Sequence, residues 1–350
     1  MTSKSFIGSY LRFFSASLSK RQIRSVIVIC KAKHHNNTVD IKEDCPTYFI
    51  DQDGAWDFKA IWSLRNIIRK EKASIVHIHN VSTLHCGTVA ARLAGIKSLN
   101  TVHQKVEKRT PKTFWRMNSY VVSSSEYLKQ FLTKHNKIAA NKLRVIPDGY
   151  TPSGNGVKTQ DIRSKLGLPA DSFLIGNIAP LVRHEDQETL LKMFRKLMRK
   201  KMNSDLLIIG RGPLRPNLEA IAEEYEIKDR VHFLEMSEVA RIKEILVELD
   251  AVVFTRNIPL ISPWVYEAMA AGKPVIVTKI GNYPEIVDEA SGFLVPCGFP
   301  ERIESAVMRI YANRDLLQNM GQAAQKRFNE RFEMDVVASG YDEVYSTMLK

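Results

Sequence analysis

Hydrophobic positions along this chain follow two alternating patterns, short continuous apolar runs and apolar residues repeated at helical spacing. The runs predict buried strands, and the repeats predict amphipathic helices. The segment Ala60–Lys72, for example, places Ile61, Leu64 and Ile68 on one helical face, and it leads into a predicted strand at Ser74–His79. Strand and helix alternate in this way through most of the chain, which is typical of parallel sheets built from βαβ units.

The same alternation predicts the other elements of both halves. In the first half, strands are expected at Ser25–Cys30, Ser98–His103, Tyr120–Ser123 and Leu143–Ile146, and helices at Thr88–Ala94 and Ser125–His135. In the second half, strands are expected at Phe173–Ile178, Asp205–Ile209, Val231–Leu234, Ala251–Thr255, Pro274–Thr278 and Gly292–Val295. Helices are expected there at Gln187–Lys200, Leu214–Tyr225, Val239–Leu249 and Ser262–Ala271, followed by a helical tail over Glu301–Lys350.

A loop-like segment, Thr151–Gly156, separates the two halves and predicts an interdomain linker. The expected fold is α/β, with two Rossmann-like, doubly wound parallel-sheet domains facing a central cleft. We expect an N-terminal domain over 1–155, a C-terminal domain over 156–335, and a final helix over 336–350 that packs back toward the first domain. Ligands of such sheets bind at the carboxyl ends of the strands.

Composition agrees with a two-domain globular protein, since the chain has 350 residues, of which 44% are hydrophobic and 25% charged. No apolar run reaches the length of about 20 residues that spans a bilayer. The N-terminus lacks the compact apolar stretch of a secretory signal. The four cysteines are scattered, which favours reduced thiols. These features predict a cytoplasmic protein.

Charge is distributed unevenly. Residues 1–157 contain 25 Lys/Arg and 10 Asp/Glu, a net charge of +15, whereas the remainder has a net charge of −2. Such asymmetry favours a surface that meets nucleic acid, anionic lipid or an anionic glycan, and a solvated basic face without a partner is the alternative. We find no helix-turn-helix, zinc-finger or RNA-binding signature, so nucleic acid is not expected.

One candidate for ligand binding is Gly210-Arg-Gly-Pro213, which follows a predicted strand and opens a predicted helix. Glycines let backbone amides approach a ligand, and a helix N-terminus attracts phosphate; a plain strand-to-helix turn explains the segment equally well. Arg215 and Pro216 stand where a dinucleotide fingerprint has its third glycine, which disfavours a nicotinamide-dependent dehydrogenase.

Histidines give a second candidate. His77 and His79 alternate on a predicted strand and face the same side, and with His85 they would suggest a metal site. No carboxylate cluster accompanies them, so ordinary hydrogen-bonded or acceptor-site histidines are the favoured interpretation.

Several motifs become specific when they occur together in one order. Glu267–Thr278 predicts a helix, a glycine stop and a buried strand, and Gly281-Asn-Tyr-Pro-Glu285 follows it. The whole set comprises Glu267–Gly298, Val145–Gly149, Ile208–Pro213, Asp229–Leu234, Val76–His79, Thr101–His103 and Val122–Ser125. In these motifs the chain resembles the family-4 retaining glycosyltransferases, which have the GT-B fold.

The resemblance implies transfer of a sugar from a nucleotide-diphosphate sugar to a hydroxyl, with retention and without a metal or other cofactor. It implies that Glu267 holds the ribose, that Gly281, Asn282 and the amides toward Glu285 line the sugar and phosphate, and that His103 acts as the catalytic residue. Further site residues implied are Gly210, Gly212 and Arg183 on the donor side, and Gly8, His79 and Ser124 on the acceptor side or in the cleft.

Three departures from the family pattern bear on activity. The first glutamate of a pair spaced eight positions apart would fall at Pro259. Pro180 and Glu185 stand where the family has an Arg and a Lys that grip the diphosphate, and Arg183 is the nearby substitute. The family's first strand and glycine-rich turn are absent or reduced to a remnant at Phe6–Ser9.

These observations lead to three hypotheses. The first is an active glycosyltransferase of bacterial surface polysaccharide or lipopolysaccharide synthesis, peripheral on the inner face of the membrane, whose basic first domain rests on anionic lipid beside a lipid-linked acceptor. The second is a catalytically impaired relative that acts as a binding or partner subunit. The third, a sugar-nucleotide epimerase of the same fold, is disfavoured because its acid and base residues have no counterpart here.

Overall fold

The computed structural model describes residues 3–31, 45–54, 56–105, 115, 117–152, 162–235 and 242–350, and the chain forms two compact units. The first unit comprises residues 1–151 and 331–350, and the second comprises residues 152–330. The expected linker over Thr151–Gly156 lies outside the described residues from position 153 onward. None of the described helices is long and apolar enough to cross a bilayer.

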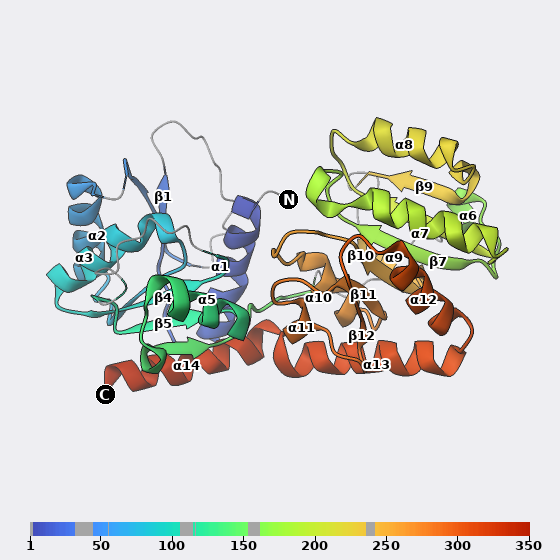
Figure 1. The fold of residues 1–350 in the computed structure, drawn as a ribbon. Helices are drawn as coiled ribbons and strands as arrows, with labels where there is room; N and C mark the ends of the chain where they lie inside the picture. Colours follow the sequence, from blue (N-terminus) through green and yellow to red (C-terminus); the bar gives the residue numbers. More distant parts are fainter. Residues whose placement is uncertain are drawn as a thin grey trace. The chain divides into compact units, whose positions relative to one another are not determined.

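The first unit contains two parallel sheets (Figure 1). A four-stranded sheet has the order β3-β4-β5-β6, and a separate two-stranded sheet pairs β1 with β2. The strands are β1 (Ile27–Lys31), β2 (Thr47–Asp51), β3 (Ile75–Ile78), β4 (Lys97–Val102), β5 (Tyr120–Ser123) and β6 (Leu143–Val145). The helices are α1 (Ser3–Ser19), α2 (Phe58–Lys70), α3 (Leu84–Ala94), α5 (Glu126–Asn136) and α14 (Met334–Leu349), with short 3₁₀ turns at Val81–Thr83 and Ala140–Lys142.

Helices α2 and α3 join the two sheets of this unit through one apolar cluster. Ile61 and Leu64 of α2 pack with Cys86 of α3, and both Val28 of β1 and Val76 of β3 pack against that cluster. The helical repeat seen in the sequence of α2 therefore faces inward, and it covers strands of both sheets.

Helix α1 differs from the expected remnant of a strand and glycine-rich turn. Gly8 lies within this helix and is buried. The segment is helical because the apolar residues after Gly8 recur at helical spacing. Tyr10, Phe14 and Leu18 pack in one cluster with residues of α14, among them Tyr341, and α1 lies beside α14 (Figure 1). The burial of this stripe stabilises a helix at Phe6–Ser9.

The second unit is built on one six-stranded parallel sheet of order β12-β11-β10-β7-β8-β9. Its strands are β7 (Phe173–Ile178), β8 (Ser204–Ile209), β9 (Val231–Leu234), β10 (Ala251–Phe254), β11 (Val275–Thr278) and β12 (Gly292–Val295). Its helices are α6 (Ile162–Leu166), α7 (Gln187–Arg199), α8 (Arg215–Glu224), α9 (Ile242–Glu248), α10 (Pro263–Ala270), α11 (Tyr283–Ile286), α12 (Pro300–Tyr311) and α13 (Arg314–Arg331), with 3₁₀ turns at Arg183–Glu185 and Lys228–Arg230. The expected helix at Val239–Leu249 lies outside the described residues before position 242.

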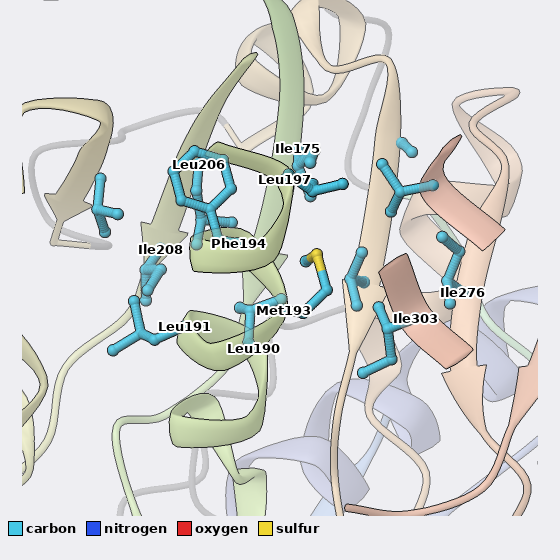
Figure 2. Packing of buried hydrophobic residues seen from close by; sticks show 14 of the residues in the cluster. Ile175, Leu190, Leu191, Met193, Phe194, Leu197, Leu206, Ile208, Ile276 and Ile303 are labelled. Carbon is cyan, nitrogen blue, oxygen red and sulfur yellow. The ribbon is translucent and has the colours of Figure 1, made fainter. Parts of the chain in front are cut away.

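A large apolar core holds α7 and α12 against this sheet (Figure 2). Leu190 and Phe194 of α7 are fully buried, as are Ile175 of β7, Leu206 of β8 and Ile303 of α12. Nearly continuous apolar strands are expected when both faces of a parallel sheet are covered. This core fixes the strand ends from which the candidate donor loops extend.

Candidate functional site

The order of the strands in the second unit locates its ligand-binding edge. The chain begins with β7 in the middle of the sheet, adds β8 and β9 on one side, and then adds β10, β11 and β12 on the other. The strand order therefore reverses between β7 and β10, and ligands of open α/β sheets bind outside the carboxyl ends of the strands at such a point. The loop after β7 carries Glu185, and the loop after β10 carries Arg256.

Glu185 and Arg256 form a buried, bidentate ion pair at this point. The Nε of Arg256 donates to Oε2 of Glu185 at 3.0 Å, and its Nη2 donates to Oε1 of the same carboxylate. The Glu185 side chain is 2% exposed and the Arg256 side chain 10% exposed. Arg256 Nη1 also donates to the carbonyl of Leu260 at 2.9 Å, and Thr255 Oγ1 donates to the Glu185 carbonyl at 2.7 Å.

This pair changes the electrostatic interpretation of Glu185. From the sequence, a glutamate at this position would repel a diphosphate; in the structure its carboxylate is neutralised by Arg256. Arg183, the substitute cation suggested by the sequence, is exposed on the 3₁₀ turn. Arg256 was not among the residues predicted from the sequence, although an arginine just after a fully buried strand is a signal that could have identified it.

Pro259, which stands at the first position of the expected glutamate pair, touches the Gly281 loop. Gly281 has a φ of +58°, and a Cβ placed on it would lie 2.9 Å from Cβ of Pro259. Both the left-handed backbone and the close approach favour glycine at 281. The loops after β10 and β11 are thus packed together at the carboxyl edge of the sheet.

Arg327 of α13 holds the segment that follows Gly281. Its Nη2 donates to the carbonyl of Glu285 at 2.9 Å, its Nε donates to the carbonyl of Ile286, and its Nη1 lies 2.6 Å from Oδ2 of Asp288. Asn282 is buried and occupies the N-cap position of α11, where its side chain makes no capping hydrogen bond. Arg327 was not predicted from the sequence, because it lies in a helical segment about 40 positions after the Gly281 motif.

Gly210 and Gly212 are required for packing. A Cβ on Gly210 would lie 1.9 Å from the carbonyl oxygen of Ala179, and one on Gly212 would lie 2.2 Å from that of Leu181. The Gly210 amide donates to the carbonyl of Leu234 at 2.9 Å. The plain strand-to-helix turn accounts for both glycines, and the Gly210 amide is already used within the protein.

Glu267 lies on α10 and is 1% exposed, among the buried Tyr266, Ala268 and Met269. A carboxylate is costly to bury unless it is hydrogen-bonded. Packing alone therefore does not explain why a glutamate occupies this position on an apolar helix. Its position on the helix that follows the Arg256–Pro259 loop places it in the part of the unit where the donor motifs converge.

The first unit brings three predicted residues to the carboxyl edge of its four-stranded sheet. His79 follows β3, His103 follows β4, and Ser124 follows β5. His79 Nδ1 lies 3.2 Å from His103 Nε2, and the Ser124 amide donates to the carbonyl of Val102 at 3.2 Å. Tyr10, two residues beyond Gly8 on α1, places its ring centroid 5.1 Å from that of His103.

Both ring nitrogens of His103 are engaged within this unit. Its Nδ1 donates to Oδ1 of the buried Asp148 at 2.6 Å, which leaves Nε2 as the nitrogen facing His79. Asp148 belongs to the Pro147-Asp-Gly149 turn that follows β6, within the motif Val145–Gly149, for which the sequence predicted no partner. The carboxylate fixes the ring orientation and tautomer of His103.

His77 lies deeper in the same cluster. Its ring nitrogens lie 2.6 Å from Tyr345 Oη and 2.6 Å from Thr101 Oγ1. Burial, and then the charge of His103, lower the pKa of His77 to about 3, and burial also lowers the pKa of His79. Within the described part of the chain, no group of three or more His, Cys, Asp or Glu side chains could hold a metal ion, so His77, His79 and His85 do not form one site.

Two parallel α/β units, one of them with its candidate ligand loops at a strand-order reversal, define a protein of two Rossmann-like domains. Comparison with known proteins gives the family. Residues 158–327 match the model of glycosyl transferases group 1, and residues 7–153 match that of glycosyltransferase family 4. The chain belongs to this family of glycosyltransferases, and its fold is GT-B.

Individual relatives are distant in sequence. The chain is 23% identical over 321 residues to the capsular polysaccharide biosynthesis glycosyltransferase CapM of Staphylococcus aureus, covering 84% of this chain and 82% of the relative. It is 25% identical over 280 residues to the UDP-Gal:alpha-D-GlcNAc-diphosphoundecaprenol alpha-1,3-galactosyltransferase of Escherichia coli, covering 73% of this chain and 70% of that protein. Among solved structures, Anabaena Alr3699/HepE in complex with UDP is similar at a TM-score of 0.79 and 16% identity, covering 97% of this chain and 96% of the other.

Proposed function

We propose that this chain transfers a sugar, with retention, from a nucleotide-diphosphate sugar to a lipid-linked glycan acceptor of bacterial surface polysaccharide or lipopolysaccharide synthesis. The observation that carries the proposal is the convergence of the donor motifs at the carboxyl edge of the six-stranded sheet, where Gly281 packs on Pro259 and Arg327 holds the Glu285 segment. The diphosphoundecaprenol substrate in the name of the E. coli relative supports a lipid-linked acceptor. The net charge of +15 over residues 1–157 supports a cytoplasmic protein that is peripheral on the anionic inner face of the membrane.

Each unit has a part in this reaction. In the second unit, Glu267 holds the ribose hydroxyls, and the loop from Gly281 to Glu285 lines the sugar and phosphates. The amides of Tyr283 and Glu285 already donate to the carbonyls of Ile280 and Asn282, so the contact to the ligand falls to Gly281 and Asn282. In the first unit, His103 acts at the sugar, oriented by Asp148. Because its Nε2 faces His79, His103 must exchange that contact for one to the donor before it can act. In this mechanism backbone dipoles of the loop after β11 stabilise the leaving diphosphate, and no metal step is included.

Nucleotide binding and turnover test the proposal separately. UDP, GDP, ADP and their sugars are added to the purified chain in a thermal-shift panel, and a ligand well above its dissociation constant raises the unfolding midpoint. We expect one nucleotide series to stabilise the chain and Glu267→Gln to weaken that stabilisation. Release of the nucleotide diphosphate in the presence of a lipid-linked acceptor then measures transfer, and analysis of the anomeric linkage tests retention.

A second candidate function is a catalytically silent binding or partner subunit. The Glu185–Arg256 pair favours it, because Glu185 stands where the resemblance places a cation for the diphosphate, and the charges of Glu185 and Arg256 compensate each other. Nucleotide binding without any release of diphosphate across a panel of acceptors would support this alternative. Release that depends on His103 would exclude it.

A further inference from the structure

The outward face of helix α2 carries large aromatic side chains that the fold of the first unit does not bury. Phe58 is 77% exposed and Trp62 is 55% exposed, and Trp56, just before the helix, is 58% exposed. The opposite face of the same helix buries Ile61 and Leu64 in the core. Exposed aromatic groups of this size, gathered on one element, are typical of a surface that meets a partner or a membrane.

Cations share the outward stripe with these aromatic residues. With about 100° between successive residues, Phe58, Trp62, Arg65 and Arg69 lie within roughly 60° of one another around the helix. The Arg65 guanidinium lies 4.6 Å from the centroid of the Trp62 ring, and its Nε donates to the carbonyl of Leu93 at 3.4 Å. Trp62 is therefore supported from the side while its ring remains exposed.

Charge around the stripe favours an anionic partner. The nearby Asp57 caps the helix, and its carboxylate accepts from the amides of Lys59 and Ala60, so part of its charge is satisfied locally. Residues 1–157 together carry a net charge of +15. Tryptophan and phenylalanine flanked by arginine and lysine match the interface of a bilayer, where aromatic rings lie at the headgroup level and cations contact anionic lipid.

We propose that Trp56, Phe58, Trp62, Arg65 and Arg69, named here the α2 face, insert into an anionic lipid bilayer. The helix lies in the plane of the membrane, with Phe58 and Trp62 among the upper acyl chains and the two arginines at the phosphates. The inference deepens the proposed function and rests on it in one respect, because a lipid-linked acceptor requires the chain at a membrane.

The full-length chain, sedimented with vesicles, tests this inference. Vesicles of phosphatidylcholine alone are compared with vesicles containing phosphatidylglycerol, at low and high salt. We expect binding to the anionic vesicles that weakens with salt. The double variant Phe58→Ser/Trp62→Ser is expected to lose at least about tenfold in partition coefficient, since each ring contributes apolar area. Phe299→Ser, at a phenylalanine of the second unit about as exposed as Trp62 (53% against 55%), is the control and should bind like the parent.

Three results would overturn the inference. The first is that the double variant binds vesicles as the parent does, and the second is that Phe299→Ser loses as much binding as the double variant. The third is that the parent chain does not bind vesicles but self-associates, and that the double variant abolishes this self-association. Tryptophan fluorescence quenched by brominated acyl chains measures insertion directly. The signal of Trp62 is the difference between Trp56→Phe and Trp56→Phe/Trp62→Phe, because both variants keep Trp115 and Trp264. Stabilisation of the chain by nucleotide, measured without lipid, separates this test from the proposed function. Binding to vesicles without binding to any nucleotide would support membrane insertion by the α2 face and contradict the proposed transferase function.

Discussion

Breaking the Glu185–Arg256 pair is expected to destabilise the second unit severely. Arg256→Met leaves the Glu185 carboxylate, which is 2% exposed, without its cation. An uncompensated buried charge of this kind costs about 3–5 kcal/mol. Whole domains are stable by about 5–15 kcal/mol, so this single change removes a large part of the stability of the unit.

Hydrogen exchange read by mass spectrometry is the suitable assay, because it reports the two units separately. Peptides from β7 and β10 should exchange about two to three orders of magnitude faster in Arg256→Met, whereas peptides from β4 and β5 should be unchanged. Arg183→Met, which removes an exposed arginine on the turn that carries Glu185, is the matched control and should have little effect.

Replacing both partners tests the cause. Glu185→Leu/Arg256→Met removes both charges, so it should recover at least half of the lost stability. Glu185→Lys places two cations together and should be at least as harmful as Arg256→Met, while Glu185→Lys/Arg256→Glu should recover stability. A cost below about 1 kcal/mol for Arg256→Met, or a double variant worse than the sum of its single changes, would refute the electrostatic account.

Two further predictions concern the donor loop and the buried histidines. Gly281→Ala should destabilise the second unit by about 1–3 kcal/mol, and it should weaken nucleotide binding more than Gly298→Ala does. Both glycines have a positive φ, but only at 281 would a Cβ meet other atoms within 4 Å. Equal effects of the two variants on the unfolding midpoint would count against the packing contact. His77, with its pKa lowered to about 3, stays neutral in the folded chain and gains a proton on unfolding below pH 6.5. The contribution of His77 to stability is therefore fully present above pH 6.5 and falls by up to about 1.4 kcal/mol per pH unit toward pH 3. The free energy of unfolding, measured by denaturation, should thus change less between pH 7 and pH 5 in His77→Phe than in the parent chain.

The sequence predicted the fold better than it predicted the site. Helical and strand periodicity predicted the order of elements, because burial of apolar faces is read directly from spacing, as with Ile61 and Leu64 in α2. Helix α1 was missed, because its inward stripe matters only once α14 is present to cover it. That contact joins residues more than 300 positions apart, and periodicity does not report such a distance.

At the site, local motifs predicted positions but not partners. His79 and His103 were expected at neighbouring strand ends, and the structure brings them within 3.2 Å. The partners Asp148 and Arg256 were not identified, because a hydrogen bond or ion pair between distant loops depends on strand order. For Gly210 the sequence left open a ligand contact or a plain turn, and the close approach of the Ala179 backbone accounts for the missing side chain.

The discontinuity of the first unit has a consequence for folding during synthesis. The second unit is contiguous over 152–330, so all of its contacts are available once that stretch has left the ribosome. The first unit must wait for α14, which is made after the whole of the second unit, and until then Tyr10 and Phe14 lack the cover of Tyr341. A unit begun before the second is thus completed after it, and the nascent chain carries an open apolar surface while the second unit is made. Premature termination anywhere before α14 would leave that surface permanently exposed to chaperones and proteases.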